Sequence, residues 1–300
     1  MKKKVMKEST AWQIGAHTVM IIGSLLAILP FILLVIASFT DNQTALVNGY
    51  SFTPEKWSLE AYQYIANEWA TIGRAYLMTI LVTVIGTALS LVITSTFAFA
   101  VSNDKLPGHK ILMFLCIFTM LFNGGLVASY YVYSNIFHIK NTIWALIVPT
   151  FLMSPFNVVL VKNYFSNSIS PSILEAARMD GAGVFAVFTK IVMPLSVPIM
   201  ATVGLMTAIG YWNDWTNGLY YLTENGGSQY YTIQLVLNRI NENINFLANN
   251  SDVAAKAAQQ LPSTTMRMAI AVIGILPIMC AYPFFQKYFV KGITIGAVKG

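Results

Sequence analysis

The residue types that most often carry catalysis do not gather anywhere in this sequence. The three histidines, His17, His109 and His138, are far apart along the chain, so no metal-binding set is visible. No Ser-His-Asp or paired-carboxylate arrangement stands out. No Gly-x-x-x-x-Gly-Lys-Ser/Thr loop, which would hold the phosphates of a nucleotide, occurs either. We therefore expect a protein that is not an enzyme, holds no metal or cofactor and does not itself hydrolyse ATP.

Uncharged polar and aromatic side chains are better candidates for ligand binding. Asn123 stands within one long apolar stretch, and Tyr211, Trp212, Asn213 and Trp215 lie together at the end of another. Amides supply hydrogen bonds and aromatic rings supply flat apolar faces, a combination that suits a neutral sugar rather than an ion. These five residues are the predicted lining of a substrate path.

Each of these signals also has a plainer explanation. The neighbouring Gly124 and Gly125 favour close helix packing, and an unwound turn is the alternative. The two tryptophans lie at a predicted membrane boundary, where an aromatic belt is the ordinary explanation. Asn157 stands in an apolar stretch, and we expect it to form a hydrogen bond between helices rather than to bind a ligand.

The composition indicates which solvent surrounds these residues. Of the 300 residues, 56% are hydrophobic and only 10% are charged, whereas about 25% of an average soluble domain is charged. This composition excludes a soluble enzyme and a disordered chain. The net charge is +6, and the basic residues that produce it lie beside apolar blocks. This placement argues against a nucleic-acid binder. Cys116 and Cys280 lie within apolar blocks and are expected to be small buried side chains rather than a pair.

Six blocks free of Asp, Glu, Lys and Arg are long enough to cross a hydrocarbon core of about 30 Å as helices. The first follows four lysines but lacks a cleavage signal, so we expect a retained signal anchor. The sequence thus predicts an all-α polytopic membrane protein with a single transmembrane domain over residues 1–300. The predicted spans cover residues 18–39, 77–101, 111–132, 142–161, 191–212 and 268–286.

The basic residues predict the orientation of these spans. With the N-terminus inside, twelve of the 18 Lys and Arg residues lie in cytoplasmic segments, as the positive-inside rule requires. Both termini are then cytoplasmic. The twelve residues are Lys2, Lys3, Lys4, Lys7, Lys105, Lys110, Lys162, Arg178, Lys190, Lys287, Lys291 and Lys299.

Three connections between the spans are long. Residues 40–76 and 213–267 lie outside and are rich in Asn, Gln, Tyr and Thr, which is typical of docking or capping elements rather than of a separate domain. Residues 162–190 form the long inner connection, which carries helix signals. Its first helix begins at the Ser-Pro pair 170–171 or at the Ser-Glu capping box 172–175.

Either start places Glu175 in the first turn, where its charge favours the helix dipole. The helix covers 174–179. Gly181 and Gly183 then end it, because glycine readily adopts left-handed conformations. A second helix, 184–191, leads into the fifth span. The two helices form a compact feature under the membrane, either a surface for another protein or an ordinary hairpin packed on the bundle.

The spacing in this loop resembles the EAA loop of ATP-binding-cassette (ABC) importer permeases. That pattern has Glu-Ala-Ala, three residues, Gly, nine residues and Ile-x-Leu-Pro. Met193 stands here in place of Leu, a swap of similar volume. Residues 120–126, 212–215 and 282–300 also resemble the LplC/YtcP-type branch of the carbohydrate importer permeases, relatives of the smaller maltose-transporter permease. The resemblance covers nearly the whole chain.

The resemblance implies a type I ABC importer permease fold in a bacterial cell membrane. Its cargo would be oligosaccharides, breakdown products of polysaccharides, delivered by an extracytoplasmic sugar-binding protein that contacts residues 213–267. It implies a heterodimer with a second permease and a dimer of ATPase subunits, which bind ATP and Mg. The inner loop would be the coupling helix that enters a cleft of the ATPase. The residues assigned to this coupling are Glu175, Ala176, Ala177, Arg178, Asp180 and Gly181.

Two other functions remain open on the residues alone. One is an ion-coupled secondary carrier, and the other is a membrane scaffold without transport activity. No Asp, Glu, Lys or Arg lies in the middle of a predicted span, whereas proton-coupled carriers usually need such groups there. A sodium-coupled carrier could still use backbone and hydroxyl ligands, so this observation favours an externally powered pathway without excluding the carrier.

Overall fold

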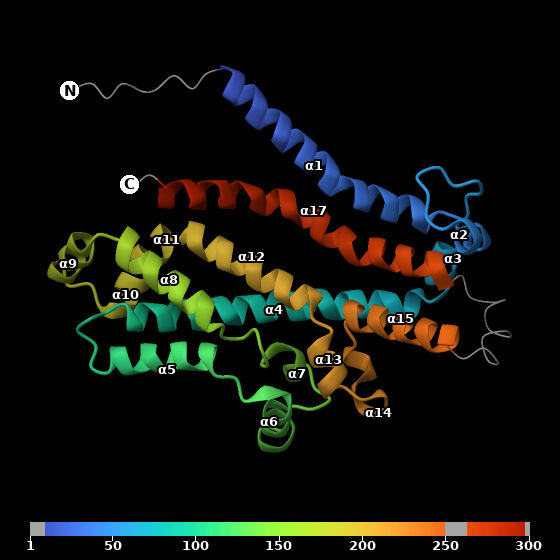
Figure 1. The fold of residues 1–300 in the computed structure, drawn as a ribbon. Helices are drawn as coiled ribbons and strands as arrows, with labels where there is room; N and C mark the ends of the chain where they lie inside the picture. The colour runs from blue at the N-terminus through green and yellow to red at the C-terminus, as the bar shows by residue number, and fades with distance from the viewer. Residues whose placement is uncertain (1–9, 250–262, 298–300) are drawn as a thin grey trace. The chain divides into compact units, whose positions relative to one another are not determined.

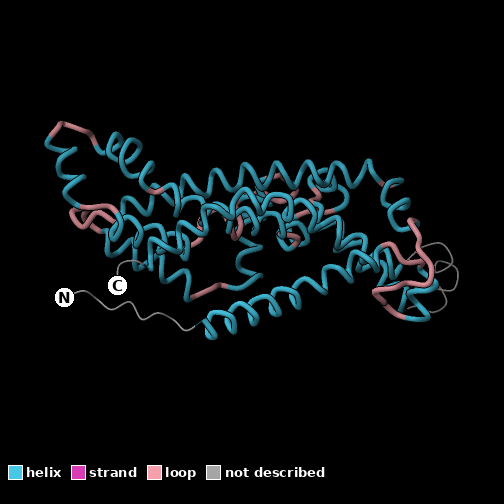
Figure 2. Tube along the Cα trace, turned by 90° about the horizontal axis from the view of Figure 1, so that it is seen from above, coloured by secondary structure: helices cyan, strands magenta, loops and turns pink. Residues whose placement is uncertain are grey.

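The computed structural model describes residues 10–249 and 263–297, which form helices joined by short loops (Figure 1, Figure 2). The basic residues at positions 2–7 and 299, and residues 250–262 of the predicted outer loop, lie outside this described part. The chain divides into two units. The first comprises residues 1–68 and 240–276, and the second comprises residues 69–239 and 277–300.

The first unit is built around the predicted first span and outer loop. Asp41 caps the short second helix, since its Oδ2 accepts a hydrogen bond from the N–H of Thr44, and its Oδ1 lies 3.0 Å from Lys56 Nζ. Thr40 and Trp57 form an isolated antiparallel bridge, so the loop is folded back on itself. The helices are α1 Thr10–Ser38, α2 Asn42–Asn48 and α3 Glu60–Asn67, with parts of α15 Ile233–Asn249 and α17 Ser263–Ala297.

The second unit is organised by one long helix, α4 Trp69–Val101, which packs against α8 and α12. Short α-helices, two π-type turns and one 3-10 turn surround it. These are α5 His109–Leu121, α6 Gly125–Tyr131, η1 Val132–Ile136, α7 Trp144–Ile147, α8 Pro155–Ser168, α9 Pro171–Met179, α10 Val184–Val187, η2 Phe188–Val192, α11 Met193–Leu195, α12 Val197–Asn213, α13 Thr216–Tyr221, α14 Glu224–Gly227 and η3 Ser228–Tyr230.

Two of the described helices are long and apolar enough to cross a membrane alone, Trp12–Ser38 and Trp69–Val101. They coincide with the first two predicted spans. Two bent helix pairs raise the number to four if each pair is one span. The membrane character of the chain is therefore evident in the described residues, and the count of six spans and the placement of the termini stay predictions.

The third predicted span, 111–132, is not one straight helix. α5 ends at Leu121, and the chain bends by 119° before α6 and η1. Gly125 has a φ of +81°, and a Cβ added there would meet nothing within 4 Å. The glycine therefore serves an unwound turn, and the packing role that the sequence favoured for it is wrong.

The fourth predicted span, 142–161, is interrupted between α7 and α8. Pro155 begins α8 at a position where its missing N–H has no helical partner to lose, and Ser154 before it is extended, as a residue preceding proline prefers. α8 continues to Ser168, so the first part of the predicted inner loop is helical. The stretch 148–154 is irregular.

The approach to the fifth predicted span, expected as a single helix over 184–191, is also broken. After α10 the chain widens into the π-type turn η2 and then bends by 80° at Ser196, between α11 and α12. Pro194 cannot donate a hydrogen bond to the carbonyl four residues earlier, and its ring would clash there. A widened turn before the proline avoids both problems.

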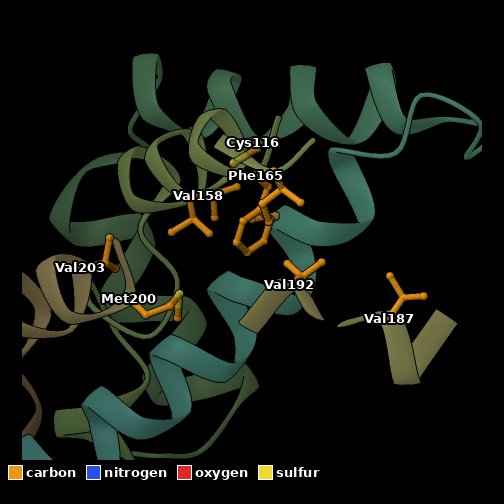
Figure 3. Packing of buried hydrophobic residues seen from close by; sticks show 10 residues of the cluster. Cys116, Val158, Phe165, Val187, Val192, Met200 and Val203 are labelled. Carbon is orange, nitrogen blue, oxygen red and sulfur yellow. The ribbon is translucent and has the colours of Figure 1, made fainter. Parts of the chain in front are cut away.

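Two apolar clusters hold the second unit together. The first joins α4, α5, α8, η2 and α12 through ten buried residues, among them Cys116, Val158, Phe165 and Met200 (Figure 3). The second surrounds Tyr211 with residues of α4, α7, α13 and α15. Cys116 is buried as predicted, but Cys280 is exposed on α17, so the expected burial is wrong for that residue.

Candidate coupling surface and substrate path

α9 begins at the Ser-Pro pair. Ser170 is extended (φ −64°, ψ 131°) and Pro171 takes the first helical position, where the fixed φ of proline suits the helix. The Ser170 and Ser172 hydroxyls lie 2.7 Å apart and bond to each other. Because the helix begins at Pro171, Glu175 is its fifth residue. The prediction that Glu175 lies in the first turn is therefore wrong.

A glycine ends α9 through a Schellman motif. The N–H of Ala182 donates to the carbonyl of Ala177 at 2.9 Å, and the N–H of Gly181 donates to the carbonyl of Arg178 at 3.0 Å. Gly181 has a φ of +80°, as predicted. Gly183 is extended instead (φ −66°) and caps α10, so its predicted left-handed role is wrong.

The two faces of α9 differ in their surroundings. Leu174 and Ala177 face inward and pack against the first apolar cluster. On the outside, Met179 is 88% exposed and Phe185, at the start of α10, is 78% exposed. Ile173 and Val184 are exposed as well. We call the exposed faces of residues 172–185 the coupling surface. It lies at the end of the second unit where α4 ends (Figure 1).

Charged side chains border this surface. Glu175 and Arg178 line a pocket of about 270 Å³, together with Asp104 and Lys105 from the loop after α4. Among the described residues, Glu175, Arg178 and Asp180 take part in no ion pair. The structure thus brings all six predicted coupling residues together on one short helix and its end, with their charges unpaired among the residues that the structure describes.

The predicted path residues are less uniform. Asn123 is exposed in the turn between α5 and α6, where its Oδ1 accepts a hydrogen bond from the N–H of Gly125 at 2.8 Å. Tyr211 is 1% exposed, and its hydroxyl donates to the carbonyl of Ile147 at 2.8 Å. Trp212 is also buried and lies 6.3 Å from the ring of Tyr76. Tyr211 therefore links α12 to α7, whereas Trp212 lines a pocket of about 470 Å³ between α4, α12 and α17.

The residues that follow Trp212 at the end of α12 are exposed again, apart from Asp214. Asn213 is exposed, although its amide donates to the carbonyl of Ile209, and Trp215 is 39% exposed. Between them, Asp214 is buried and accepts hydrogen bonds from the N–H of Thr216 and from the Asn217 amide. Burial raises the pKa of Asp214 above its usual 3.8, although these hydrogen bonds oppose the shift.

Sequence reasoning missed Asp214 as an organising residue. The signal was present, because an Asp just before a short helix commonly accepts hydrogen bonds from the first N–H groups. It correctly predicted Asn157, whose Nδ2 donates to Thr207 Oγ1 at 3.2 Å between α8 and α12. It also missed Ser90, which binds the carbonyl of Phe151. No local signal marks Ser90, since its partner is 61 residues away.

Comparison with known proteins identifies the group to which this architecture belongs. Residues 90–295, which include α9, α12 and most of α17, match the model of a family described as "Binding-protein-dependent transport system inner membrane component". The chain belongs to this family. The two long apolar helices and the bent pairs are therefore those of a membrane-embedded transport component.

Relatives of this permease are similar over nearly its whole length. It is 36% identical over 277 residues to the polygalacturonan/rhamnogalacturonan transport system permease protein YtcP of Bacillus subtilis (strain 168), covering 92% of this chain and 94% of the relative. It is 35% identical over 275 residues to the protein LplC of the same organism, covering 92% and 90%. The resemblance to that branch of permeases is confirmed.

A solved structure shows the same fold. The permease superposes with a TM-score of 0.78 and 28% identity on a chain from the crystal structure of a bacterial ABC transporter involved in the import of the acidic polysaccharide alginate. The match covers 93% of this chain and 96% of that chain. The type I ABC importer permease fold is therefore confirmed, although the apolar runs are bent and interrupted.

Proposed function

We propose that this chain is one of two permease subunits of an ABC importer that takes up oligosaccharides released from polysaccharides. Membership of the family supports the transport role. The names of YtcP and of the alginate importer support a carbohydrate as the cargo. An extracytoplasmic sugar-binding protein would deliver the sugar to the outer loops, in particular to residues 213–267.

The coupling surface is the observation that carries this proposal. Met179 and Phe185 lie close together outside the predicted spans, where lipid does not cover them, and such an exposed apolar patch is typical of a protein-binding surface. Here they stand beside unpaired charges on a helix that ends in a left-handed glycine. The fitting partner is an ATPase subunit whose cleft covers the apolar side chains and pairs the charges. That partner, rather than this chain, would bind ATP and Mg.

The packing of α9 suggests how a movement of the ATPase subunits is transmitted to the membrane helices. Its inner face, at Leu174 and Ala177, is fixed to the apolar cluster that joins α4, α8 and α12. A close-packed cluster transmits displacement because it has little free volume to absorb it. Movement of the ATPase would therefore move α9 as a lever and switch the pathway between inward-open and outward-open states.

Within the predicted substrate path, the structure favours a division of roles. Asn123, Asn213 and Trp215 have exposed side chains and are the proposed sugar-facing residues. Tyr211 and Trp212 are buried, so we assign to them the positioning of the neighbouring backbone. The second permease would supply the other side of the path.

Two matched glycine variants test the coupling role. A Cβ at Gly181 or at Gly183 would meet nothing within 4 Å, so space does not distinguish them. Only Gly181 has a positive φ, where a non-glycine residue costs about 1–2 kcal/mol. In the transporter reconstituted with its partner subunits, Gly181→Ala should lower the sugar taken up per ATP hydrolysed several-fold. Gly183→Ala should leave that ratio unchanged.

The cargo is tested in the same proteoliposomes. Oligogalacturonates and neutral maltooligosaccharides would be compared for stimulation of ATP hydrolysis and for uptake. Uptake of either class supports the proposal and decides the charge of the cargo. Uptake that continues without the ATPase subunits would contradict the proposal and favour an ion-coupled carrier.

A further inference from the structure

The irregular stretch 148–154 between α7 and α8 is held in place from three sides. It lies within the fourth predicted span, next to α13 (Figure 1). Side chains of three other elements donate hydrogen bonds to carbonyls in it or at its edge. These bonds are Tyr211 Oη to Ile147 O at 2.8 Å, Ser90 Oγ to Phe151 O at 3.0 Å and Asn217 Nδ2 to Pro149 O at 3.5 Å.

The bond to Ser90 indicates the depth of this stretch in the membrane. Ser90 lies on α4 eleven residues before Val101, the last residue of the helix and the predicted inner end of the span. At 1.5 Å per residue this separation is about 16 Å, roughly half of a hydrocarbon core of about 30 Å. Phe151 and its neighbours are therefore close to the middle of the membrane.

Part of the backbone here has no hydrogen-bond partner. Within the described residues, the peptide groups of Thr150 and Met153 and the carbonyl of Leu152 form no hydrogen bond, and neither does the Thr150 hydroxyl, whereas the N–H of Leu152 closes the turn at residues 149–151. Thr150 and Met153 are exposed. Thr150 also has a φ of +69°, a conformation that a β-branched residue rarely adopts. The surrounding bonds hold it there.

Lipid cannot be the neighbour of these groups. An unpaired peptide group in hydrocarbon costs several kcal/mol, and irregular backbone at this depth is tolerated only inside protein or beside water. A helix of a second permease would not satisfy them well, because its own peptide groups are already paired. Free N–H, C=O and hydroxyl groups side by side match sugar hydroxyls, each of which both donates and accepts.

We propose that residues 148–154 line the sugar path at the middle of the membrane. The peptide groups of Thr150 and Met153, the carbonyl of Leu152 and the Thr150 hydroxyl hydrogen-bond the hydroxyls of the passing oligosaccharide. Ser90, Tyr211 and Asn217 are the positioning residues that keep this backbone open. The inference rests on the proposed import function and adds a site for the sugar within this chain.

Cysteine labelling tests whether the stretch faces water. In a background of Cys116→Ala and Cys280→Ser, Thr150→Cys is compared with Val92→Cys. Val92 is 60% exposed on α4 at a similar depth, but it lies on a continuous helix. In the assembled transporter a charged maleimide should label the cysteine at 150 at least tenfold faster than the one at 92. Equal rates would overturn the proposal. Met153→Cys replaces Thr150→Cys if the latter does not assemble.

Protection and uptake then test contact with the sugar. The oligosaccharide that the unmodified transporter takes up, from the oligogalacturonate and maltooligosaccharide panel, should slow labelling at position 150. Thr150→Val should raise the half-saturating sugar concentration by about tenfold, as expected for one lost hydrogen bond, and Thr150→Ser should change it by less than about twofold. Labelling that this sugar does not slow overturns the inference alone. Absence of any uptake by the unmodified transporter overturns the proposed function.

Discussion

Gly86 on α4 leaves space for the ring of Tyr211 on α12. A Cβ added at Gly86 would lie 2.5 Å from Cζ of Tyr211 and less than 3 Å from two further ring atoms. The ring cannot easily move aside, because its hydroxyl donates to the carbonyl of Ile147 and its centroid lies 5.2 Å from that of the tilted Phe151 ring. Gly86→Ala should therefore destabilise the permease.

The magnitude follows from two contributions. Inserting a methyl group into a well-packed core costs about 1–3 kcal/mol. If the ring moves far enough to break its hydrogen bond, the buried Ile147 carbonyl is left unpaired, which costs about 1–3 kcal/mol more. The expected loss is thus about 2–6 kcal/mol, a fall of roughly 5–15 °C in the apparent melting midpoint.

Two glycines in other α-helices serve as controls, because a Cβ added to them would meet less obstruction than one at Gly86. A Cβ at Gly23 of α1 meets nothing within 4 Å, so Gly23→Ala should leave the midpoint unchanged or raise it slightly, since alanine favours helices. A Cβ at Gly204 lies 3.2 Å from a terminal methyl of Leu91, which can rotate away. Gly204→Ala should therefore give an intermediate loss.

The assay heats membranes that contain the permease with its partner subunits and measures the fraction that stays soluble and folded after detergent extraction. Equal midpoints for Gly86→Ala and Gly23→Ala would refute the reasoning. A second variant isolates the cause. Combining Gly86→Ala with Tyr211→Leu removes the ring, so the double variant should lose less than the sum of the two single losses.

Three further outcomes are expected from the described contacts. A double-mutant cycle of Asn157→Ala and Thr207→Val should give a coupling energy of about 0.6–2 kcal/mol, measured by the same heating assay. Because burial raises the pKa of Asp214, its contribution to stability is full below about pH 3.8 and declines as the pH rises through the raised value. Asp214→Asn should remove that decline from midpoints measured at pH 4 and pH 7. Asn163→Pro, in the middle of α8, should abolish sugar-stimulated ATP hydrolysis while Asn163→Ala preserves it.

The helix α9 could be predicted from sequence because its signals are local. A Ser-Pro start and a glycine stop act within one or two turns, and both Pro171 and Gly181 have the predicted roles. The error at Glu175 arose from two competing starts a few residues apart. Apolar composition also predicted the membrane environment correctly, since burial in lipid depends on residue type rather than on detailed packing.

The breaks in the spans could not be seen by counting apolar residues. Hydropathy measures whether side chains tolerate lipid, whereas the path of the backbone depends on which carbonyls lose their partners. Pro149 and Pro155 both lie within the fourth predicted span, and these two prolines are a sequence signal for the break in that span. The burial of Tyr211 could not be predicted from sequence, because the space for its ring is provided by Gly86, 125 residues earlier in the chain.

One element joins the two surfaces to which function is assigned. α8 starts directly after the irregular stretch 148–154 and ends three residues before Pro171, where α9 begins. Along its length it packs against α4 and α12 through Val158, Val161 and Phe165, and its two ends continue into the hydrogen-bonded stretch 148–154 and into the buried Ile169. On the proposed function, a displacement of α9 by the ATPase would reach the proposed sugar site through the continuous helix α8. A proline at position 163 interrupts that helix without touching either surface, which separates loss of transmission from loss of binding.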